Sequence, residues 1–261
     1  MDDLFSASTR ERSFKNAPLA VRMRPNSLDE YVGQQKAVGK GSWLRAAIEH
    51  DVLSSVILYG PAGTGKTTLA HIIANHTKSE FVEVSAVTGT VKDLRRVIDE
   101  AKTRLNTYDR RTILFIDEIH RFSKSQQDAL LHAVENRTVV MIGATTENPY
   151  FEVNSALLSR GRVVELEHLK DEDIAMLIER ALEAPQGLNG KFSADDDTVK
   201  TICTLAAGDA RSALTTLELA SEIAVTRPDT EGTPAPAAGE RYPITVDDVK
   251  IANPRRGFSY D

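Results

Sequence analysis

The chain has 261 residues, of which 41% are hydrophobic and 27% are charged, and its formal net charge is −6 at pH 7. These values are typical of a globular protein and exclude a disordered tail or a fibre. The acidic balance argues against a protein that coats nucleic acid by bulk electrostatics, while a local basic groove stays compatible with it. With no long apolar run and no apolar signal-peptide core, the sequence predicts a soluble, intracellular protein.

Short apolar runs alternate with helix-like stretches through the first two thirds of the chain. Strands are expected at residues 56–59, 81–84, 112–116, 139–143 and 163–166, and helices at residues 66–76, 91–105 and 124–134. Strands of four or five residues made almost entirely of Val, Ile, Leu and Phe are typical of a parallel sheet that is buried on both faces. The pattern predicts a doubly wound α/β domain over residues 18–169, after a flexible lead-in at residues 1–17.

The remainder of the chain is expected to be helical. Helices are predicted at residues 171–182, 198–207, 211–225 and 246–251, which together form a small domain over residues 170–253. Within it, residues 227–243 are rich in Pro, Gly and Ala and have no periodicity, so this segment is predicted to be a mobile loop. The single cysteine, Cys203, cannot form an intrachain disulfide, and no Cys/His cluster has the spacing of zinc ligands.

The strongest motif lies between the first expected strand and the first expected helix. Residues 60–67 match the phosphate-binding loop G-x-x-x-x-G-K-[ST], in which glycines let backbone N–H groups point at phosphate oxygens. Lys66 is expected to reach the β- and γ-phosphates, and the Thr67 hydroxyl to bind Mg²⁺. A glycine-rich turn without function is the alternative. The expected nucleotide-contacting residues of this loop and the following turn are Gly60, Pro61, Ala62, Gly63, Thr64, Gly65, Lys66, Thr67 and Thr68.

Two adjacent carboxylates, Asp117 and Glu118, follow the apolar strand at residues 112–116. A strand delivers Asp117 at its carboxyl end, where the side chain is expected to hold Mg²⁺ through water. Glu118 is then available to orient or deprotonate an attacking water. Taken alone, the pair is also compatible with a strand that leads into a solvated turn. Its place about 50 residues after a phosphate-binding loop favours nucleotide hydrolysis over phosphate transfer, since a kinase excludes water.

At this point the chain resembles the AAA+ ATPases, which implies ATP and Mg²⁺ as cofactors. The stretch over residues 18–34 looks like the N-terminal adenine-contacting segment of clamp loaders and their relatives. The resemblance therefore implies adenine contacts from Arg24, Pro25, Tyr31 and Val32.

Further motifs of the same resemblance imply residues that sense or assist hydrolysis. Residues 142–149 look like the end of the sensor 1 strand, with Thr146 as the expected sensor and Thr145 as the second choice. Arg160, in Leu-Leu-Ser-Arg, resembles an arginine finger that crosses to a neighbouring subunit, although Gly161 stands where clamp loaders have Cys. Arg211, in Gly-Asp-Ala-Arg, matches sensor 2.

Each of these residues also has a plainer interpretation. Arg160 and Arg211 are equally compatible with ordinary surface arginines, because arginine side chains are mostly exposed. The segment 120–122 is expected to be a solvated turn rather than a direct DNA contact. The basic residues between positions 95 and 111 are expected to form a solvated helix face: Arg95, Arg96, Lys102, Arg104, Arg110 and Arg111.

The combination of these motifs resembles the replication-associated recombination protein A family, whose eukaryotic relative is the Werner-helicase-interacting ATPase. The resemblance covers residues 18–261 apart from the insert at 227–243. It implies a cytoplasmic, nucleoid-associated, DNA-dependent ATPase acting at stalled or damaged replication forks and in repair and recombination. It also implies a homotetramer whose partners are forked, single-stranded or end DNA without sequence specificity, together with single-stranded-DNA-binding protein and replisome components, and no membrane.

Alternatives remain open within and beyond this class. A clamp-loader subunit or a Holliday-junction branch-migration motor shares the same sensor and finger residues. A nucleotide-gated scaffold with negligible turnover is the alternative of another class, against which Asp117 and Glu118 argue. Residues 254–261 are expected to begin a missing C-terminal region that carries oligomer contacts in the family, so hydrolysis by this chain alone is expected to be weak.

Overall fold

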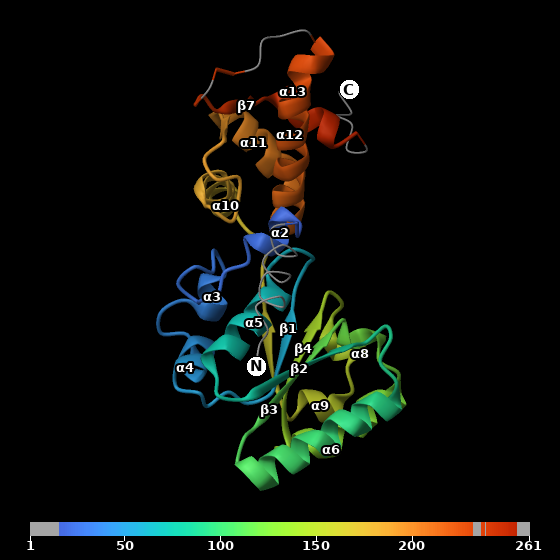
Figure 1. Cartoon of the computed structure of the whole chain (residues 1–261). Coiled ribbons are helices and arrows are strands. Elements are labelled where there is room, and N and C mark those ends of the chain that lie inside the picture. The colour runs from blue at the N-terminus through green and yellow to red at the C-terminus, as the bar shows by residue number, and fades with distance from the viewer. Residues whose placement is uncertain (1–15, 232–235, 238, 255–261) are drawn as a thin grey trace. The chain divides into compact units, whose positions relative to one another are not determined.

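The computed structural model describes residues 16–231, 236–237 and 239–254 (Figure 1). The chain divides into two compact units, one made of residues 25–168 and the other of residues up to 24 together with those from 169 onward. The expectations for residues 1–15 and 255–261 lie outside the described residues. In the described part of the chain, no helix has the length and apolar character that a membrane span requires.

A five-stranded parallel sheet forms the centre of the first unit. Its strands lie in the order β2-β3-β4-β1-β5, so β1 lies between β4 and β5, and β3 lies between β2 and β4. The strands are β1 (Val56–Tyr59), β2 (Glu80–Ser85), β3 (Thr112–Asp117), β4 (Val139–Thr145) and β5 (Arg162–Glu165). This arrangement confirms the predicted α/β fold with a parallel sheet, and it brings the carboxyl ends of β1, β3 and β4 to one edge.

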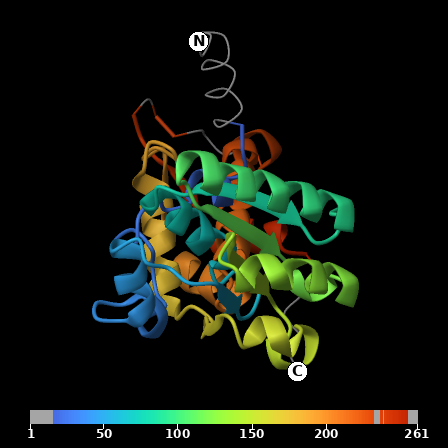
Figure 2. The ribbon, with the colours of Figure 1, turned by 90° about the horizontal axis from the view of Figure 1, so that it is seen from below.

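Helices cover both faces of this sheet (Figure 2). Alternate residues of β1 show this, because Leu58 packs with the cluster that includes α4 and α5, while Ile57 packs with the cluster that includes α6 and α7. The helices of the unit are α3 (Gln35–Val38), α4 (Trp43–Glu49), α5 (Lys66–His76), α6 (Val91–Tyr108), α7 (Lys124–Glu135), α8 (Pro149–Glu152) and α9 (Ser155–Leu158), with a 3-10 turn η1 (Ile119–Arg121).

Capping boxes determine where the two longest helices of this unit begin. Thr90 accepts a hydrogen bond from the Asp93 backbone N–H at 3.2 Å, and the Asp93 carboxylate accepts one from Thr90 N at 3.0 Å. The same reciprocal pair forms between Ser123 and Gln126 at the start of α7. Hydrogen bonds from Thr90 lower the pKa of the Asp93 carboxyl, so this cap is fully formed at neutral pH.

The second unit is mainly helical, as predicted, but the expectation of helices alone is wrong, because two short strands pair within it. It contains α2 (Leu19–Arg22), α10 (Asp171–Glu183), α11 (Asp196–Ala206), α12 (Ala210–Glu231) and α13 (Val246–Ala252), with β6 (Phe192–Ala194) paired in parallel with β7 (Tyr242–Ile244). Leu19 N donates to Glu218 Oε1 at 2.9 Å, and Arg22 forms an ion pair with the same carboxylate at 3.3 Å. These contacts explain why α2 groups with the helical unit, whereas the sequence placed residues 18–24 in the α/β domain.

At both ends of the predicted mobile loop at residues 227–243 the structure has regular elements instead, and residues 232–235 and 238 lie outside the described residues. Helix α12 continues to Glu231, and β7 begins at Tyr242. Arg227 explains the first difference, because its Nη1 lies 2.6 Å from the buried Asp248 Oδ2 of α13 and its Nη2 donates to Pro243 O at 3.0 Å. Local composition carries no signal for an ion pair between residues 21 positions apart.

Candidate active site

The phosphate-binding loop runs from the end of β1 to the start of α5, as the sequence predicted. Two of its glycines admit no side chain. A Cβ at Gly60 would lie 2.2 Å from Leu166 O, and a Cβ at Gly65 would lie 2.5 Å from Tyr31 Oη. Gly65 also has a φ of 96°, which L side chains adopt at a cost. The loop therefore holds its backbone close to its neighbours, in a shape that only glycine allows.

Helix α5 begins directly at Lys66, and no side chain caps its N-terminal amides. Lys66 is only 7% exposed, and its Nζ donates to Gly60 O at 2.6 Å and to Pro61 O at 2.7 Å. A turn of backbone amides, a helix N-terminus and a buried ammonium group together match the charge and hydrogen-bonding needs of a phosphate chain. The residues present therefore fit the nucleotide that the sequence predicted.

The other residues of the loop and three of the expected adenine contacts, Pro25, Tyr31 and Val32, belong to the same unit as Lys66. Thr64 is buried and donates to Pro61 O at 2.9 Å, while Ala62 is exposed and Gly63, Thr67 and Thr68 are partly exposed. Tyr31 is buried and donates to Thr64 O at 3.2 Å, so this hydrogen bond holds the backbone of the loop in place. Burial raises the pKa of the Tyr31 phenol. Val32 and Pro25 are partly buried in the same unit, and their adenine contacts stay a prediction.

The acidic pair stands at the carboxyl end of β3, one strand away from β1 through β4. Asp117 Oδ1 accepts a hydrogen bond from Glu118 N at 3.2 Å, which orients the carboxylate at the strand end. Glu118 has a left-handed backbone with a φ of 55°, and its side chain is 33% exposed. The Asp117 carboxylate and the Thr67 hydroxyl are hard oxygen ligands of the kind that Mg²⁺ prefers. Among the described residues, no group of three or more His, Cys, Asp or Glu side chains gathers into a metal site.

His120 connects the acidic pair to the neighbouring strand. Its Nδ1 lies 3.3 Å from Glu118 Oε2 and 2.9 Å from the hydroxyl of Thr145, the last residue of β4. The contact with Glu118 is an ion pair when the imidazole is protonated, and the direction of the hydrogen bond with Thr145 depends on the tautomer of His120. The side chain of His120 is 15% exposed and Phe122 is buried, so the expected solvated turn at residues 120–122 is wrong at these two positions.

The two threonines considered as sensor 1 differ in their surroundings. Thr145 is fully buried, and its hydroxyl accepts a hydrogen bond from Glu147 N at 3.0 Å in addition to its contact with His120. Thr146, the first choice from sequence, is the next residue and is partly exposed. Its role as a sensor stays a prediction, whereas Thr145 is the threonine connected to Glu118 through His120.

Arg160 follows α9 in an exposed turn of the same unit. Its Nη2 lies 2.7 Å from Glu135 Oε1 at the end of α7, and its Nη1 donates to Ala156 O at 2.8 Å. Arg160 holds the pKa of the Glu135 carboxyl below its ordinary value through this hydrogen bond and its positive charge. The Arg160 side chain is about one-third exposed, and its role toward a neighbouring subunit stays a prediction.

Arg24 and Arg211 belong to the helical unit. Arg211 is the second residue of α12 and is exposed, and the helix start is capped by Asp209, whose Oδ1 accepts from Ser212 N at 2.8 Å. Arg24 is partly buried. The structure thus brings the loop, Asp117, Glu118 and Thr145 to one sheet edge in a single unit, while the roles of Arg24 and Arg211 toward nucleotide stay predictions.

Known proteins share these features. Residues 56–170 match the family described as "ATPase family associated with various cellular activities (AAA)". The chain is 50% identical over 209 residues to replication-associated recombination protein A of Escherichia coli K12, which covers 79% of this chain and 46% of that protein. It is 43% identical over 217 residues to the ATPase WRNIP1 of Dictyostelium discoideum, covering 83% of this chain and 24% of the relative.

A solved structure agrees with this likeness. The Thermotoga maritima RuvB Holliday junction branch migration motor matches with a TM-score of 0.69 and 29% identity, covering 88% of this chain and 72% of that one. The chain spans about half the length of the curated bacterial relatives it matches. The loop and acidic pair on one sheet edge thus lie in the AAA-matching part of the chain, and over about four fifths of its length the chain is similar to replication-associated recombination protein A and to the ATPase WRNIP1.

Proposed function

We propose that this chain is the ATP-hydrolysing core of a DNA-dependent AAA+ motor that acts in replication-fork maintenance, repair and recombination. The observation that carries the proposal is the sheet edge at which the loop of residues 60–67 and the pair Asp117 and Glu118 lie together. The names of the relatives support the replication and recombination part, because the chain is 50% identical to a replication-associated recombination protein.

In this proposal the loop amides and Lys66 bind the β- and γ-phosphates of ATP, and Thr67 and Asp117 hold Mg²⁺, the latter through water. Mg²⁺, when bound, neutralises charge on the phosphate oxygens. Glu118 accepts the proton of the attacking water or orients that water, because its carboxylate is not required as a Mg²⁺ ligand. His120 is a positioning residue, because its Nδ1 contacts both Glu118 Oε2 and the Thr145 hydroxyl.

Arg160 supplies its guanidinium to the γ-phosphate site of a neighbouring subunit, so hydrolysis requires assembly. An arginine provided in this way contributes about 10³ to 10⁵ in rate. Its ion pair with Glu135 holds the guanidinium against its own subunit and fixes its direction at the surface. We further propose a homo-oligomer, a tetramer in the whole protein, with single-stranded-DNA-binding protein and replisome components as partners, in the bacterial cytoplasm at the nucleoid.

The substitution Glu118→Gln tests the hydrolytic part. It should preserve ATP binding, measured with a fluorescent nucleotide, and abolish turnover, because the amide cannot accept the proton. Glu152→Gln, an exposed carboxylate on α8, is the matched control and should turn over as the wild type does. Retained steady-state hydrolysis in Glu118→Gln would remove Glu118 from the catalytic role, and absence of turnover in wild type at high protein concentration with DNA ends would favour a nucleotide-gated scaffold.

A second candidate is a branch-migration motor, favoured by the likeness to the RuvB structure at a TM-score of 0.69. The two candidates differ in their DNA substrate. Migration of a synthetic four-way junction by the whole protein with ATP would favour this second function, and hydrolysis stimulated by forks or ends without migration would favour the first.

A further inference from the structure

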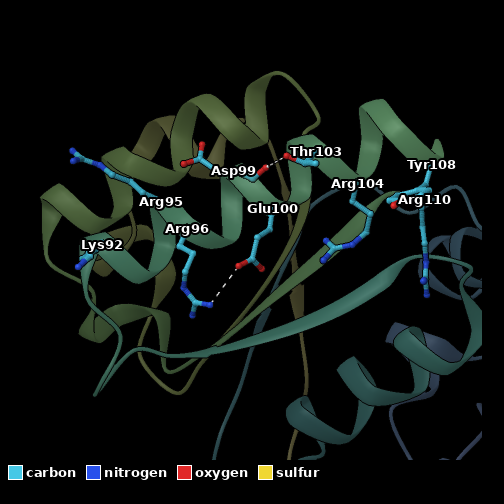
Figure 3. Close-up of a pocket in the computed structure, with 9 residues that line it drawn as sticks. All are labelled: Lys92, Arg95, Arg96, Asp99, Glu100, Thr103, Arg104, Tyr108 and Arg110. Carbon is cyan, nitrogen blue, oxygen red and sulfur yellow. Dashed lines mark hydrogen bonds and ion pairs between the residues drawn. The ribbon is translucent and has the colours of Figure 1, made fainter. Parts of the chain in front are cut away.

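Outside the nucleotide site, helix α6 carries an open groove along its exposed side (Figure 3). The groove has a volume of about 1070 Å³. Five cationic residues and one aromatic residue give it its chemical character: Lys92, Arg95, Arg96, Arg104, Arg110 and Tyr108. We call this surface the α6 groove. It belongs entirely to the α/β unit.

The charge of the α6 groove is opposite to that of the chain. Its lining includes only two acids, Asp99 and Glu100, so cations exceed acids by three in a protein whose net charge is −6. A local positive potential on an acidic protein indicates attraction of an anionic ligand to that place rather than to the whole surface.

The cations differ in how firmly they are held. Arg104 Nη1 donates to the buried Thr112 hydroxyl at 2.7 Å, and Arg110 pairs with Glu80 at 3.1 Å. The side chains of Lys92 and Arg95, by contrast, form no ion pair or hydrogen bond with the described residues. Figure 3 shows Lys92 and Arg95 at the end of the groove away from Tyr108. These two charges are therefore the ones available to a ligand without breaking an existing contact.

The aromatic residue is placed at the other end of the groove. Tyr108, the last residue of α6, is 74% exposed and lies beside Arg110 (Figure 3). Sixteen residues separate it from Lys92, which is about 24 Å along a helix. A large exposed aromatic ring next to an arginine offers a stacking face for a base, and the distance to Lys92 leaves room for several nucleotides.

We propose that the α6 groove binds single-stranded DNA, with Lys92 and Arg95 on the phosphates and Tyr108 stacked on a base. The inference rests on the proposed DNA dependence and assigns it to a surface. Single-stranded DNA fits better than a duplex, because unpaired bases are free to stack on Tyr108 whereas paired bases are already stacked. The acids in the middle of the groove also oppose the denser charge of two strands.

The first test measures binding of a labelled 20-nucleotide single strand by fluorescence anisotropy at several salt concentrations. The double variant Lys92→Ala/Arg95→Ala should bind more weakly, and the slope of log affinity against log salt should fall by about 1.4. Lys102→Ala is the matched control, since Lys102 is an exposed cation on the same helix outside the groove. It should leave the slope nearly unchanged.

Two further variants change binding in opposite directions. Tyr108→Ala should lower the affinity for the single strand by about five- to 150-fold and leave binding to a duplex of equal length unchanged. Asp99→Asn should raise the affinity, because it removes a negative charge from the groove, and a gain of function cannot come from misfolding.

The outcomes separate the groove from the proposed function. Equal binding by wild type and the double variant would overturn the groove while DNA dependence stands. A wild type that hydrolyses ATP but binds no single strand at low salt would overturn the groove and leave hydrolysis intact. A preference for duplex together with no effect of Tyr108→Ala would overturn the single-stranded assignment. Loss of affinity in the double variant, with Lys102→Ala unchanged, supports the proposal.

Discussion

The substitution His120→Ala tests how the Glu118 carboxylate, which we propose to be catalytic, is held in place. In the structure His120 Nδ1 lies 3.3 Å from Glu118 Oε2 and 2.9 Å from Thr145 Oγ1. A partly exposed contact between an imidazole and a carboxylate contributes about 1 kcal/mol, and the Glu118 side chain is 33% exposed. We therefore expect turnover to fall about fivefold.

The assay is steady-state hydrolysis as a function of ATP concentration, with folding checked by thermal denaturation. Because His120 contacts the carboxylate rather than the phosphate loop, kcat should fall while KM for ATP stays within about twofold. His120→Asn retains an N–H donor and should recover part of the loss. His132→Ala, an exposed histidine on α7, is the matched control.

Two results would refute the reasoning. One is a kcat within about twofold of the wild type in folded His120→Ala protein, which would mean that Glu118 is positioned without the histidine. The other is an equal loss in His120→Asn and His120→Ala together with a raised KM, which would indicate a general distortion of the sheet edge.

Three further predictions follow from the same geometry. Gly65→Ala should abolish binding of fluorescent ATP and lower the free energy of unfolding by at least about 1 kcal/mol, because a Cβ there would lie 2.5 Å from Tyr31 Oη; unchanged ATP affinity would contradict it. Leu94 of α6 is fully buried, so Leu94→Ala should lower the free energy of unfolding, measured by urea denaturation, by about 2–5 kcal/mol. Arg160→Ala should raise the pKa of Glu135 back to the ordinary value of a glutamate in an NMR titration, because the Glu135–Arg160 attraction is present at neutral pH and is lost as pH falls through the lowered pKa.

The α/β half of the fold was accessible from sequence because its signals are local. Strand β1 and helix α5 match the predicted bounds, since a continuous apolar run and a glycine loop mark their ends. Helix α4 was missed because its seven residues carry little periodicity, and its Ser42 cap is a single hydrogen bond at 3.2 Å. Local pattern therefore predicted the strands and the long helices of this unit and not the short helices.

What sequence could not supply was the pairing of distant residues. Arg227 was placed in a loop because its neighbours are Pro and Gly, yet its ion pair with Asp248 extends α12. The ion-pair partner of Arg160 was likewise not predicted, since Glu135 lies 25 positions away at the end of another helix. Such contacts depend on the packing of elements, for which a single sequence carries no spacing rule.

Contacts between distant residues also limited what could be predicted of the candidate site. The sequence predicted that the Glu118 carboxylate acts on the attacking water, but it did not predict which side chains position that carboxylate. Parallel pairing places β4 between β1 and β3, so the end of β4 is the one position adjacent to both the phosphate loop and the carboxylate. Thr145 occupies it: its backbone O accepts from Gly60 N at 3.2 Å and its hydroxyl contacts His120. The phosphate loop is therefore connected to Glu118 by two hydrogen bonds through Thr145 and by the 3.3 Å contact of His120 Nδ1 with Glu118 Oε2.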